Sequence, residues 1–257
     1  MSTTREPDQA LREARASSFG VGADLYDRTR PAYPDDAVAW VLPRPSDGAA
    51  APRVLDLAAG TGKLTAGLVA AGADVVAVEP SDGMRATLRR ALPDVPALGG
   101  SAERIPLDGA SLDGVVVAQA WHWFDQAAAC AEVARVLRGG GRLGVLWNVR
   151  SHTVDWVRRF TEIIHRGDTL GSSHGPPVLT GPFGPLEHAT FPWTQHLRTS
   201  ALRDLAGTRS HVLTLPPADR EALLGEVDAL AREHPDLRGR EHVDMPYVTV
   251  CWRADRA

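Results

Sequence analysis

The chain has 257 residues, 44% apolar and 23% charged, which is the composition of an ordinary soluble globular protein. A domain of common size has about 150 residues, so the length predicts a single core with about a hundred additional residues. A net charge of −4 and a pI near 6.1 argue against a dedicated binder of nucleic acid or anionic membranes, because either partner requires a basic face. The N-terminus lacks a secretory signal and no apolar run reaches about 18 residues, so we expect a cytoplasmic protein with no membrane partner.

In the first part of the chain, up to Asn148, short apolar runs alternate with segments of helical spacing. Near-continuous β-branched runs are typical of strands buried on both faces of a parallel sheet. The alternation predicts an α/β fold with a doubly wound sheet and right-handed crossovers. The expected strands are 54–57, 74–79, 95–98, 114–120 and 143–147, and the expected helices are 33–42, 64–71, 83–92 and 126–137.

The alternation ends after Asn148. Helices are expected there at 154–165 and 217–233, and strands at 189–197 and 247–252.

Two glycine motifs are interpreted by their context. Gly139, Gly141 and Gly144 fit G-x-G-x-x-G, but they follow a helix and lead into a strand, so they predict a helix C-cap and a turn. The segment from Gly171 to Gly175 fits G-x-S-x-G, but the strand that a hydrolase nucleophile requires does not precede it.

The strongest local signal is DLAAGTG, from Asp56 to Gly62, between the first expected strand and a helix. Small residues there allow backbone N–H groups to approach a ligand, and a helix N-terminus favours negative charge. Glu79 ends the second expected strand, where a carboxylate can accept hydrogen bonds from two ribose hydroxyls. Loop and acid together predict a nucleoside-binding site, and a tight turn with a surface acid is the alternative.

Four segments, DLAAGTG, VEPSDGM, GSAERIP and VVVAQAWHWFD, together resemble class I S-adenosylmethionine (SAM)-dependent methyltransferases. The resemblance is to the small-molecule branch that includes trans-aconitate and ubiquinone/menaquinone methyltransferases. It implies a Rossmann-like sheet of seven strands, mostly parallel with the last strand antiparallel, and helical lid insertions. It also implies SAM as cofactor, S-adenosylhomocysteine (SAH) as product and a small-molecule methyl acceptor. No nucleic acid partner is expected, because QAWH stands where amino-group DNA methyltransferases carry Asn/Asp-Pro-Pro-Tyr and the charge balance is acidic.

The resemblance implies a role for each matching residue. Gly60 and Gly62 would hold the methionine part of SAM, Asp56 would anchor its amino group and Glu79 its ribose. Ala58 stands where the family has its first loop glycine, which implies an altered loop path. The other cofactor contacts would be Pro80, Ser81 and Met84, then Ser101, Ala102 and Glu103 near the adenine, Gln119 and Ala120 near the sulfonium, and Tyr26 and Arg30 from a covering segment.

His122 is the candidate general base, because an imidazole titrates near neutral pH. A structural role for this ring is the alternative, since methyl transfer needs a base only when the acceptor must lose a proton. Packing of the N-terminal helix onto the core is likewise the alternative for Tyr26 and Tyr33. The substrate-binding candidates are Tyr33, His122, Trp123, Trp147 and Asn148, with residues 152–160 and 209–211.

Three functional regions follow: an N-terminal helical cover (1–50), a SAM-binding core (51–148), and a part that completes the sheet and carries the acceptor pocket (149–257). An NAD(P)-dependent oxidoreductase is an alternative, although Thr65 replaces the third fingerprint glycine. A non-catalytic SAM- or nucleoside-binding protein is another. The cysteines and histidines show no metal-ligand spacing, so no metal is expected.

Overall fold

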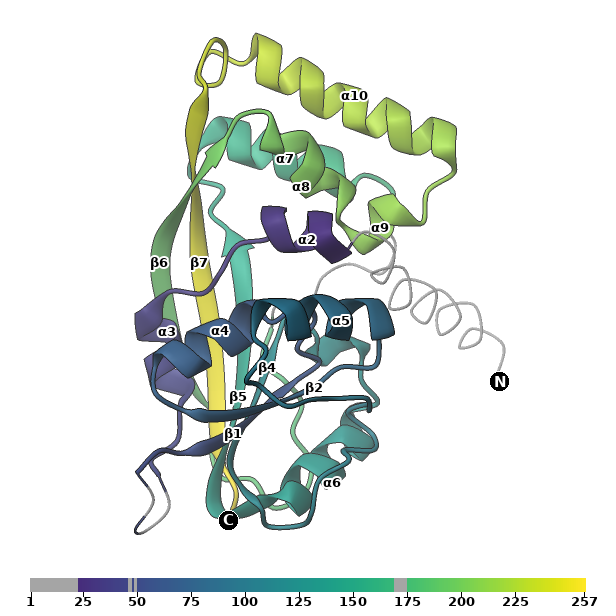
Figure 1. The fold of residues 1–257 in the computed structure, drawn as a ribbon. Coiled ribbons are helices and arrows are strands. Elements are labelled where there is room, and N and C mark those ends of the chain that lie inside the picture. The colour runs from purple at the N-terminus through teal and green to yellow at the C-terminus, as the bar shows by residue number, and fades with distance from the viewer. Residues whose placement is uncertain (1–22, 46–47, 49, 169–174) are drawn as a thin grey trace, which may run out of the picture. The chain divides into compact units, whose positions relative to one another are not determined.

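The computed structural model describes residues 23–45, 48, 50–168 and 175–257 (Figure 1). The segment from Gly171 to His174 and the chain before residue 23, including the start of the expected cover, lie outside the described residues. The chain forms two compact units. Unit 1 consists of Met1–Pro31, Arg150–Ser172 and Pro192–Val248, and unit 2 of Ala32–Val149, Ser173–Phe191 and Thr249–Ala257.

A parallel sheet forms the centre of unit 2. Strand β1 (Arg53–Leu57) pairs with β2 (Asp74–Val78) on one side and with β4 (Leu112–Ala118) on the other. The short β3 (Ala97–Leu98) pairs with β2, and β5 (Leu137–Arg150) pairs with β4. All four pairings are parallel, as the buried apolar runs predict.

The sheet has seven strands in the order β3-β2-β1-β4-β5-β7-β6, with β6 at Glu187–Arg198 and β7 at His242–Asp255. Strand β7 runs antiparallel to β5, because Gly140 bonds to Arg256 while Ser151 bonds to Pro246. The Rossmann-like sheet with its antiparallel last strand is therefore confirmed. The order reverses between β1 and β4, which is where open α/β sheets bind ligands.

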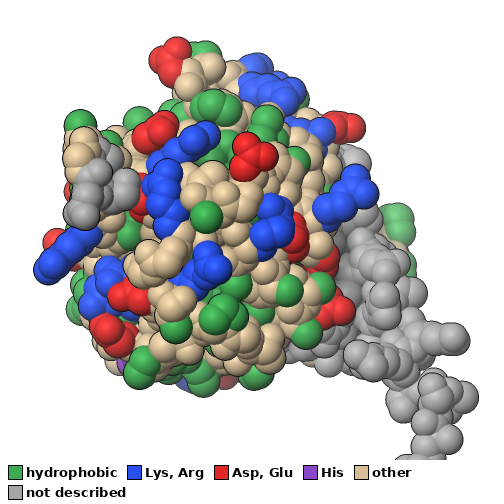
Figure 2. Space-filling view, turned by 90° about the horizontal axis from the view of Figure 1, so that it is seen from below, with side chains coloured by type: hydrophobic (Ala, Val, Ile, Leu, Met, Phe, Trp, Pro, Cys, Tyr) green, Lys and Arg blue, Asp and Glu red, His purple; other side chains and the backbone are tan. Residues whose placement is uncertain are grey.

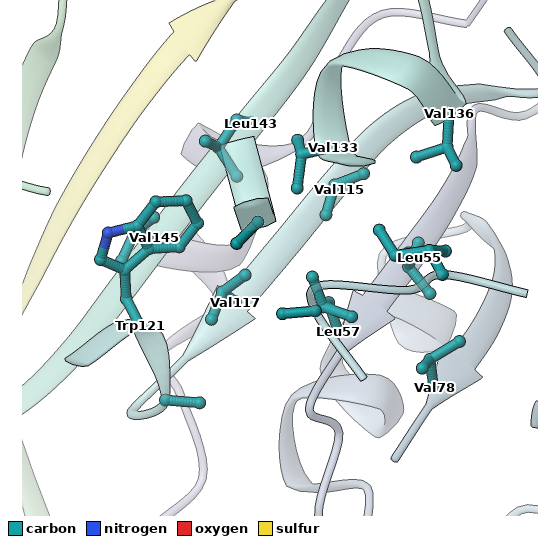
Figure 3. Close-up of a cluster of buried hydrophobic side chains, with 14 of the residues drawn as sticks. Leu55, Leu57, Val78, Val115, Val117, Trp121, Val133, Val136, Leu143 and Val145 are labelled. Atoms are coloured by element: carbon teal, nitrogen blue, oxygen red, sulfur yellow. The ribbon is translucent and has the colours of Figure 1, made fainter. Parts of the chain in front are cut away.

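Alternate residues of the strands of unit 2 pack against helices on opposite faces. On one face, Val54 and Val116 pack against α3 (Asp35–Val41) and α4 (Lys63–Ala70). On the other face, Leu55, Val115 and Val117 pack against α6 (Gln126–Val136), whose Val133 and Val136 are fully buried. Figure 3 shows this second cluster, with Trp121 at one side. The doubly wound arrangement thus follows from strands that are apolar on both faces.

Side-chain caps fix where two helices of unit 2 begin. Ser81 accepts a hydrogen bond from the backbone N–H of Met84 at the start of α5 (Asp82–Ala91). Asp125 accepts from the N–H groups of Ala127 and Ala128 at the start of α6. These residues satisfy N–H groups that have no partner within the helix.

Unit 1 has a core of its own. Helix α7 (Asp155–His165) contributes Trp156 and Phe160, and α10 (Pro217–Glu233) contributes Leu223 and Val227. The other helices in the described part of unit 1 are α2 (Ala23–Thr29), α8 (Ala201–Gly207) and α9 (Ser210–Leu213). The expected bounds of α10 agree with the structure, whereas α8 and α9 were not expected.

The glycines after α6 do not form the expected C-cap and turn. The helix ends at Val136, and Gly139, Gly141 and Gly144 all lie within β5. Close approach in the sheet explains two of them. A Cβ on Gly141 would lie 3.1 Å from the carbonyl oxygen of Asp113, and one on Gly144 would lie 2.8 Å from Cβ of Val41. The motif therefore serves packing in unit 2.

Substitution of Gly144 by Ala tests this packing. The added methyl group would meet Val41 of α3, so we expect the free energy of unfolding in urea to fall by about 1–3 kcal/mol. The control is Gly225→Ala in α10, where a Cβ meets nothing within 4 Å. Helix propensity predicts that this second change stabilises the protein by about 1 kcal/mol. Equal stability of Gly144→Ala and the unsubstituted protein would contradict the assignment.

Candidate functional site

The loops that follow β1 and β2 are joined by one carboxylate. Glu79 accepts a hydrogen bond from the backbone N–H of Gly60 at 3.0 Å and one from that of Ser81 at 2.9 Å, each with a different oxygen. The side chain is buried, and burial raises the pKa of Glu79 although both hydrogen bonds oppose the shift. Each carboxylate oxygen has a second lone pair, so Glu79 retains the capacity to accept from a ligand.

The loop after β1 has a backbone conformation that favours glycine at three positions. The φ angles are 58° at Ala58, 58° at Gly60 and 91° at Gly62. Ala58 therefore adopts the conformation expected of a glycine, although the left-handed region costs an alanine about 1 kcal/mol. Gly62 also lies close to α5, because a Cβ there would meet Leu88 at 3.0 Å. The loop brings backbone N–H groups toward the end of β1 without side chains that would block them.

Asp56 is almost completely buried near the end of β1. Its Oδ2 accepts a hydrogen bond of 2.6 Å from the Thr65 hydroxyl, and its Oδ1 has no hydrogen-bond partner within the described part of the chain. Burial is the main cause that raises the pKa of Asp56 from 3.8 to about 7, and the charge of Glu79 adds to the shift. A buried carboxylate with one open oxygen is suited to a cationic or N–H donor.

Two threonines complete this loop, and sequence reasoning did not assign them a role. Thr65 orients Asp56, and Thr61 is buried with a hydroxyl that has no hydrogen-bond partner among the described residues. The position of Thr65, in the first turn of α4 directly after the glycines, is the signal that identifies it. An amphipathic pattern alone would have treated both as surface residues.

Three residues expected near an adenine ring lie together after β3. Ser101 forms a β-bridge with Arg104, Ala102 is buried in the core, and Glu103 is exposed and accepts from the N–H of Asp125 at 3.1 Å. Met84, in α5, is buried, and its sulfur would lie 3.9 Å from a Cβ on Gly60.

Gln119 and Ala120 follow β4, at the point where the strand ends. Gln119 has a φ of 58° and donates from its side chain to the carbonyl oxygen of Asn148 at 3.3 Å. Ala120 precedes the 3-10 helix η1 (Trp121–Trp123). The positive φ at Gln119 turns the chain sharply away from the sheet.

His122 lies between two indole rings. Its ring centroid is 4.3 Å from that of Trp123 and 5.2 Å from that of Trp147. Trp147 is buried in β5, whereas Trp123 is partly buried against the core. The three side chains form one aromatic group after β4.

Asn148 and Tyr33 both have structural contacts. The amide of Asn148 donates to the carbonyl oxygen of Ala32 at 2.9 Å and accepts from the Thr249 hydroxyl at 2.6 Å. Tyr33 packs against the core beneath α3. Asn148 thus links the segment before α3 to β7.

Tyr26 and Arg30 belong to unit 1. The Arg30 guanidinium lies 4.9 Å from the centroid of the Tyr26 ring. It donates from Nε to the Thr208 hydroxyl at 3.1 Å and from Nη2 to the Thr208 carbonyl at 2.8 Å.

Charged side chains of both signs lie on the surface of the protein (Figure 2). On the face drawn in Figure 2, basic and acidic side chains are interspersed. Within the described ranges, no group of three or more His, Cys, Asp or Glu is placed to hold a metal ion. In the same part of the chain, no helix combines the length and apolarity needed to cross a bilayer.

The chain is similar to proteins that are named methyltransferases. A family model described as a methyltransferase domain matches residues 55–145. An uncharacterized methyltransferase of Mycobacterium tuberculosis is 49% identical over 241 residues, which are 93% of this chain and 96% of that protein. This chain belongs to the SAM-dependent methyltransferases.

The similarity to menaquinone enzymes is narrower. The demethylmenaquinone methyltransferase of Beutenbergia cavernae is 44% identical over 94 residues, only 36% of this chain and 39% of that protein. A solved structure from Anaeromyxobacter dehalogenans, named as a type II methyltransferase, has 26% identity and a TM-score of 0.64, covering 88% of this chain and 97% of that one. The methyltransferase is thus an enzyme whose cofactor is SAM, and the oxidoreductase alternative is set aside.

The loops of this methyltransferase fit SAM. The open Oδ1 of Asp56 and the open hydroxyl of Thr61 are buried polar atoms without partners in the described chain, and SAM has an ammonium and a carboxylate group to offer them. Glu79 can accept from ribose hydroxyls, and side chains at Gly60 or Gly62 would obstruct the loop.

Asp56 should make the stability of the methyltransferase depend on pH. The folded protein keeps this proton up to about pH 7, whereas the unfolded chain releases it near pH 3.8. The stabilisation is therefore full below about pH 4 and is lost as pH rises to about 7. We expect Asp56→Asn to flatten this decline and to exceed the unsubstituted protein in free energy of unfolding at pH 8, by up to a few kcal/mol at about 1.4 kcal/mol per pKa unit.

The measurement is urea unfolding of the ligand-free protein from pH 4 to pH 8. Asp94→Asn, which changes an exposed carboxylate, is the control and should follow the unsubstituted protein. An equal decline in Asp56→Asn would show that Asp56 ionises normally.

Proposed function

We propose that the enzyme transfers the methyl group of SAM to a small-molecule acceptor. The observation that carries the proposal is the joining of the β1 and β2 loops by Glu79, which leaves a buried carboxylate beside a glycine-rich loop. The net charge of −4 argues against a nucleic acid acceptor. The sequence segments that resemble the small-molecule branch support the same acceptor class.

In this proposal, unit 2 binds SAM through residues with distinct tasks. Glu79 accepts from the ribose hydroxyls, and the Asp56 carboxylate accepts from the amino group. The backbone at Ala58, Gly60 and Gly62 passes along the methionine part. The remaining contacts are Pro80, Ser81 and Met84 on one side, Ser101, Ala102 and Glu103 near the adenine, and Gln119 and Ala120 near the sulfonium.

Asp56 gives this binding a defined pH dependence. Its pKa of about 7 means that the carboxylate is half protonated near neutral pH, and a cationic ammonium favours the ionised form. Cofactor binding should therefore release a proton and strengthen as pH rises to about 7.

When bound, SAM supplies a methyl carbon made electrophilic by the adjacent sulfonium. A lone pair of the acceptor forms the new bond to this carbon, the carbon–sulfur bond breaks, and its electron pair stays on sulfur to give SAH. Holding the acceptor in line with that bond supplies much of the acceleration. Where the acceptor must lose a proton, Nδ1 or Nε2 of His122 is the proposed recipient.

The other proposed contacts are made with the acceptor, or belong to the N-terminal segment that is proposed to cover SAM. Trp123 and Trp147, which flank His122, offer flat apolar surfaces to an acceptor. Tyr33 and Asn148 are further candidates, although their contacts support a structural contribution. Tyr26 and Arg30 are proposed to cover the methionine part of SAM.

Glu79 is tested by SAH binding in isothermal titration calorimetry. Glu79→Gln keeps one acceptor oxygen but removes the charge, so we expect the SAH dissociation constant to rise about 100-fold, or about 2–3 kcal/mol. The control is Asp82→Asn, because that exposed acid lies three residues away and its side chain contacts Arg85. Undiminished SAH binding by Glu79→Gln would overturn the ribose assignment. Binding of NAD(H) but not SAH to the unsubstituted protein would overturn the function.

His122 is tested by turnover. With methyl-deuterated SAM and a small-molecule extract, mass spectrometry identifies the acceptor by its gain of the labelled methyl group. If His122 accepts a proton, His122→Gln should lower kcat about 100-fold at unchanged SAH affinity, and the rate should no longer fall at acidic pH. Full turnover by this variant would leave His122 with a packing role beside Trp123 and Trp147.

A further inference from the structure

Unit 1 brings together three arginines, two of which, Arg150 and Arg209, the cofactor assignment does not explain. Arg30 follows α2, Arg150 ends β5, and Arg209 precedes α9. Helices α2 and α8 are in contact, and α9 follows α8 directly (Figure 1). The Arg30 guanidinium donates to Thr208, the residue directly before Arg209. The charges of Arg30 and Arg150 both act on Arg209.

The surroundings of these arginines are poor in negative charge. Asp168 contributes one negative charge near Arg209, whereas the three guanidinium groups carry three positive charges. Arg150 lies 5.3 Å from the centroid of the Phe160 ring and has a side-chain hydrogen bond with Tyr247. Aromatic contacts stabilise a cation only partly, and they do not remove its charge.

The hydrogen-bonding capacity of two of the arginines is also incomplete. Nε of Arg150 and Nε of Arg209 are buried, and neither has a hydrogen-bond partner in the described part of unit 1. Arg30 differs, because its Nε and Nη2 donate to Thr208. An unpaired buried donor destabilises the folded state, and more so when it is charged. Burial and the neighbouring arginines hold the pKa of Arg209 well below its usual range.

A guanidinium group does not lose its proton in a protein, so this penalty persists until a negative partner arrives. The Nε and Nη donors of an arginine form a planar fork that matches the two oxygens of a carboxylate or the oxygens of a phosphate. In both Arg150 and Arg209, the Nε of this fork is available.

We infer that Arg150 and Arg209, beside the charge of Arg30, form a binding site for a small oxyanion. The ligand of this site in unit 1 is an acid that carries a carboxylate or phosphate group. Three arginines against one carboxylate favour a ligand with two negative charges over one with a single charge.

The test uses the full chain and three probes, which are succinate, citrate and inorganic phosphate, each against sodium chloride of the same ionic strength. Ligands that bind the folded state raise its thermal midpoint with concentration. We expect at least one probe to raise the midpoint of the unsubstituted protein above the chloride control. A larger shift with succinate or citrate assigns the site to a carboxylate, and a larger shift with phosphate assigns it to a phosphate group.

Arg209→Met and Arg150→Met keep much of the side-chain length and remove the charge, so both should lose the anion-dependent shift. Arg209→Lys and Arg150→Lys retain the charge without the planar fork of donors, so they should weaken anion binding about tenfold. If a methionine variant does not fold, the corresponding lysine variant still tests the site. Arg198→Met is the matched control, because Arg198 is an exposed arginine of unit 1 paired with Glu241. It should keep the full shift.

SAH binding to the same variants separates this inference from the proposed function. Unchanged SAH affinity in the Arg150 and Arg209 variants, with anion binding lost, supports an anion site that does not take part in cofactor binding. Loss of SAH affinity would show that these arginines bind the carboxylate of the cofactor instead, and would overturn the inference. An anion-dependent shift that persists in both methionine variants would also overturn it. Absence of SAH binding in the unsubstituted protein would refute the proposed function alone.

Discussion

The arrangement of the loops in unit 2 depends on one buried carboxylate with two backbone partners. Glu79 holds the loop after β1 through Gly60 and the loop after β2 through Ser81. The loops after two neighbouring parallel strands can differ in their relative position even when both strands end at the same edge of the sheet. The two hydrogen bonds of Glu79 fix that relative position, and burial makes these hydrogen bonds costly to break. Asp56 adds a second carboxylate nearby, whose proton responds to the charge of Glu79.

The parallel core could be predicted from sequence because its signals are local. Strands buried on both faces carry continuous β-branched runs, as in GVVVA before Gln119, and no other common element requires them. The glycine loop and Glu79 were identified by their place after such strands. The bounds of helix α10 were predicted correctly, because Pro217 marks its start and its apolar residues recur at helical spacing.

Features that depend on distant residues could not be predicted. Gly144 looks like a turn residue until α3 is known to place Val41 against it. Thr65 looks like an ordinary helix residue until Asp56 is known to be buried beside it. Arg30 and Arg150 are separated by more than a hundred residues of sequence, so no pattern of residue spacing predicts that they belong to the same unit. Charge that is buried by tertiary contacts has no sequence signature.

The contacts of Asn148 bear on how the protein folds during its synthesis. Its amide joins Ala32 to Thr249, partners that lie 116 and 101 residues away in opposite directions along the chain. Unit 2 therefore takes its first and last segments from chain regions that leave the ribosome far apart in time. During synthesis, the loops after β1 and β2 emerge well before β7 can cover the adjacent edge of β5. The nascent chain thus has an exposed strand edge until Thr249 emerges.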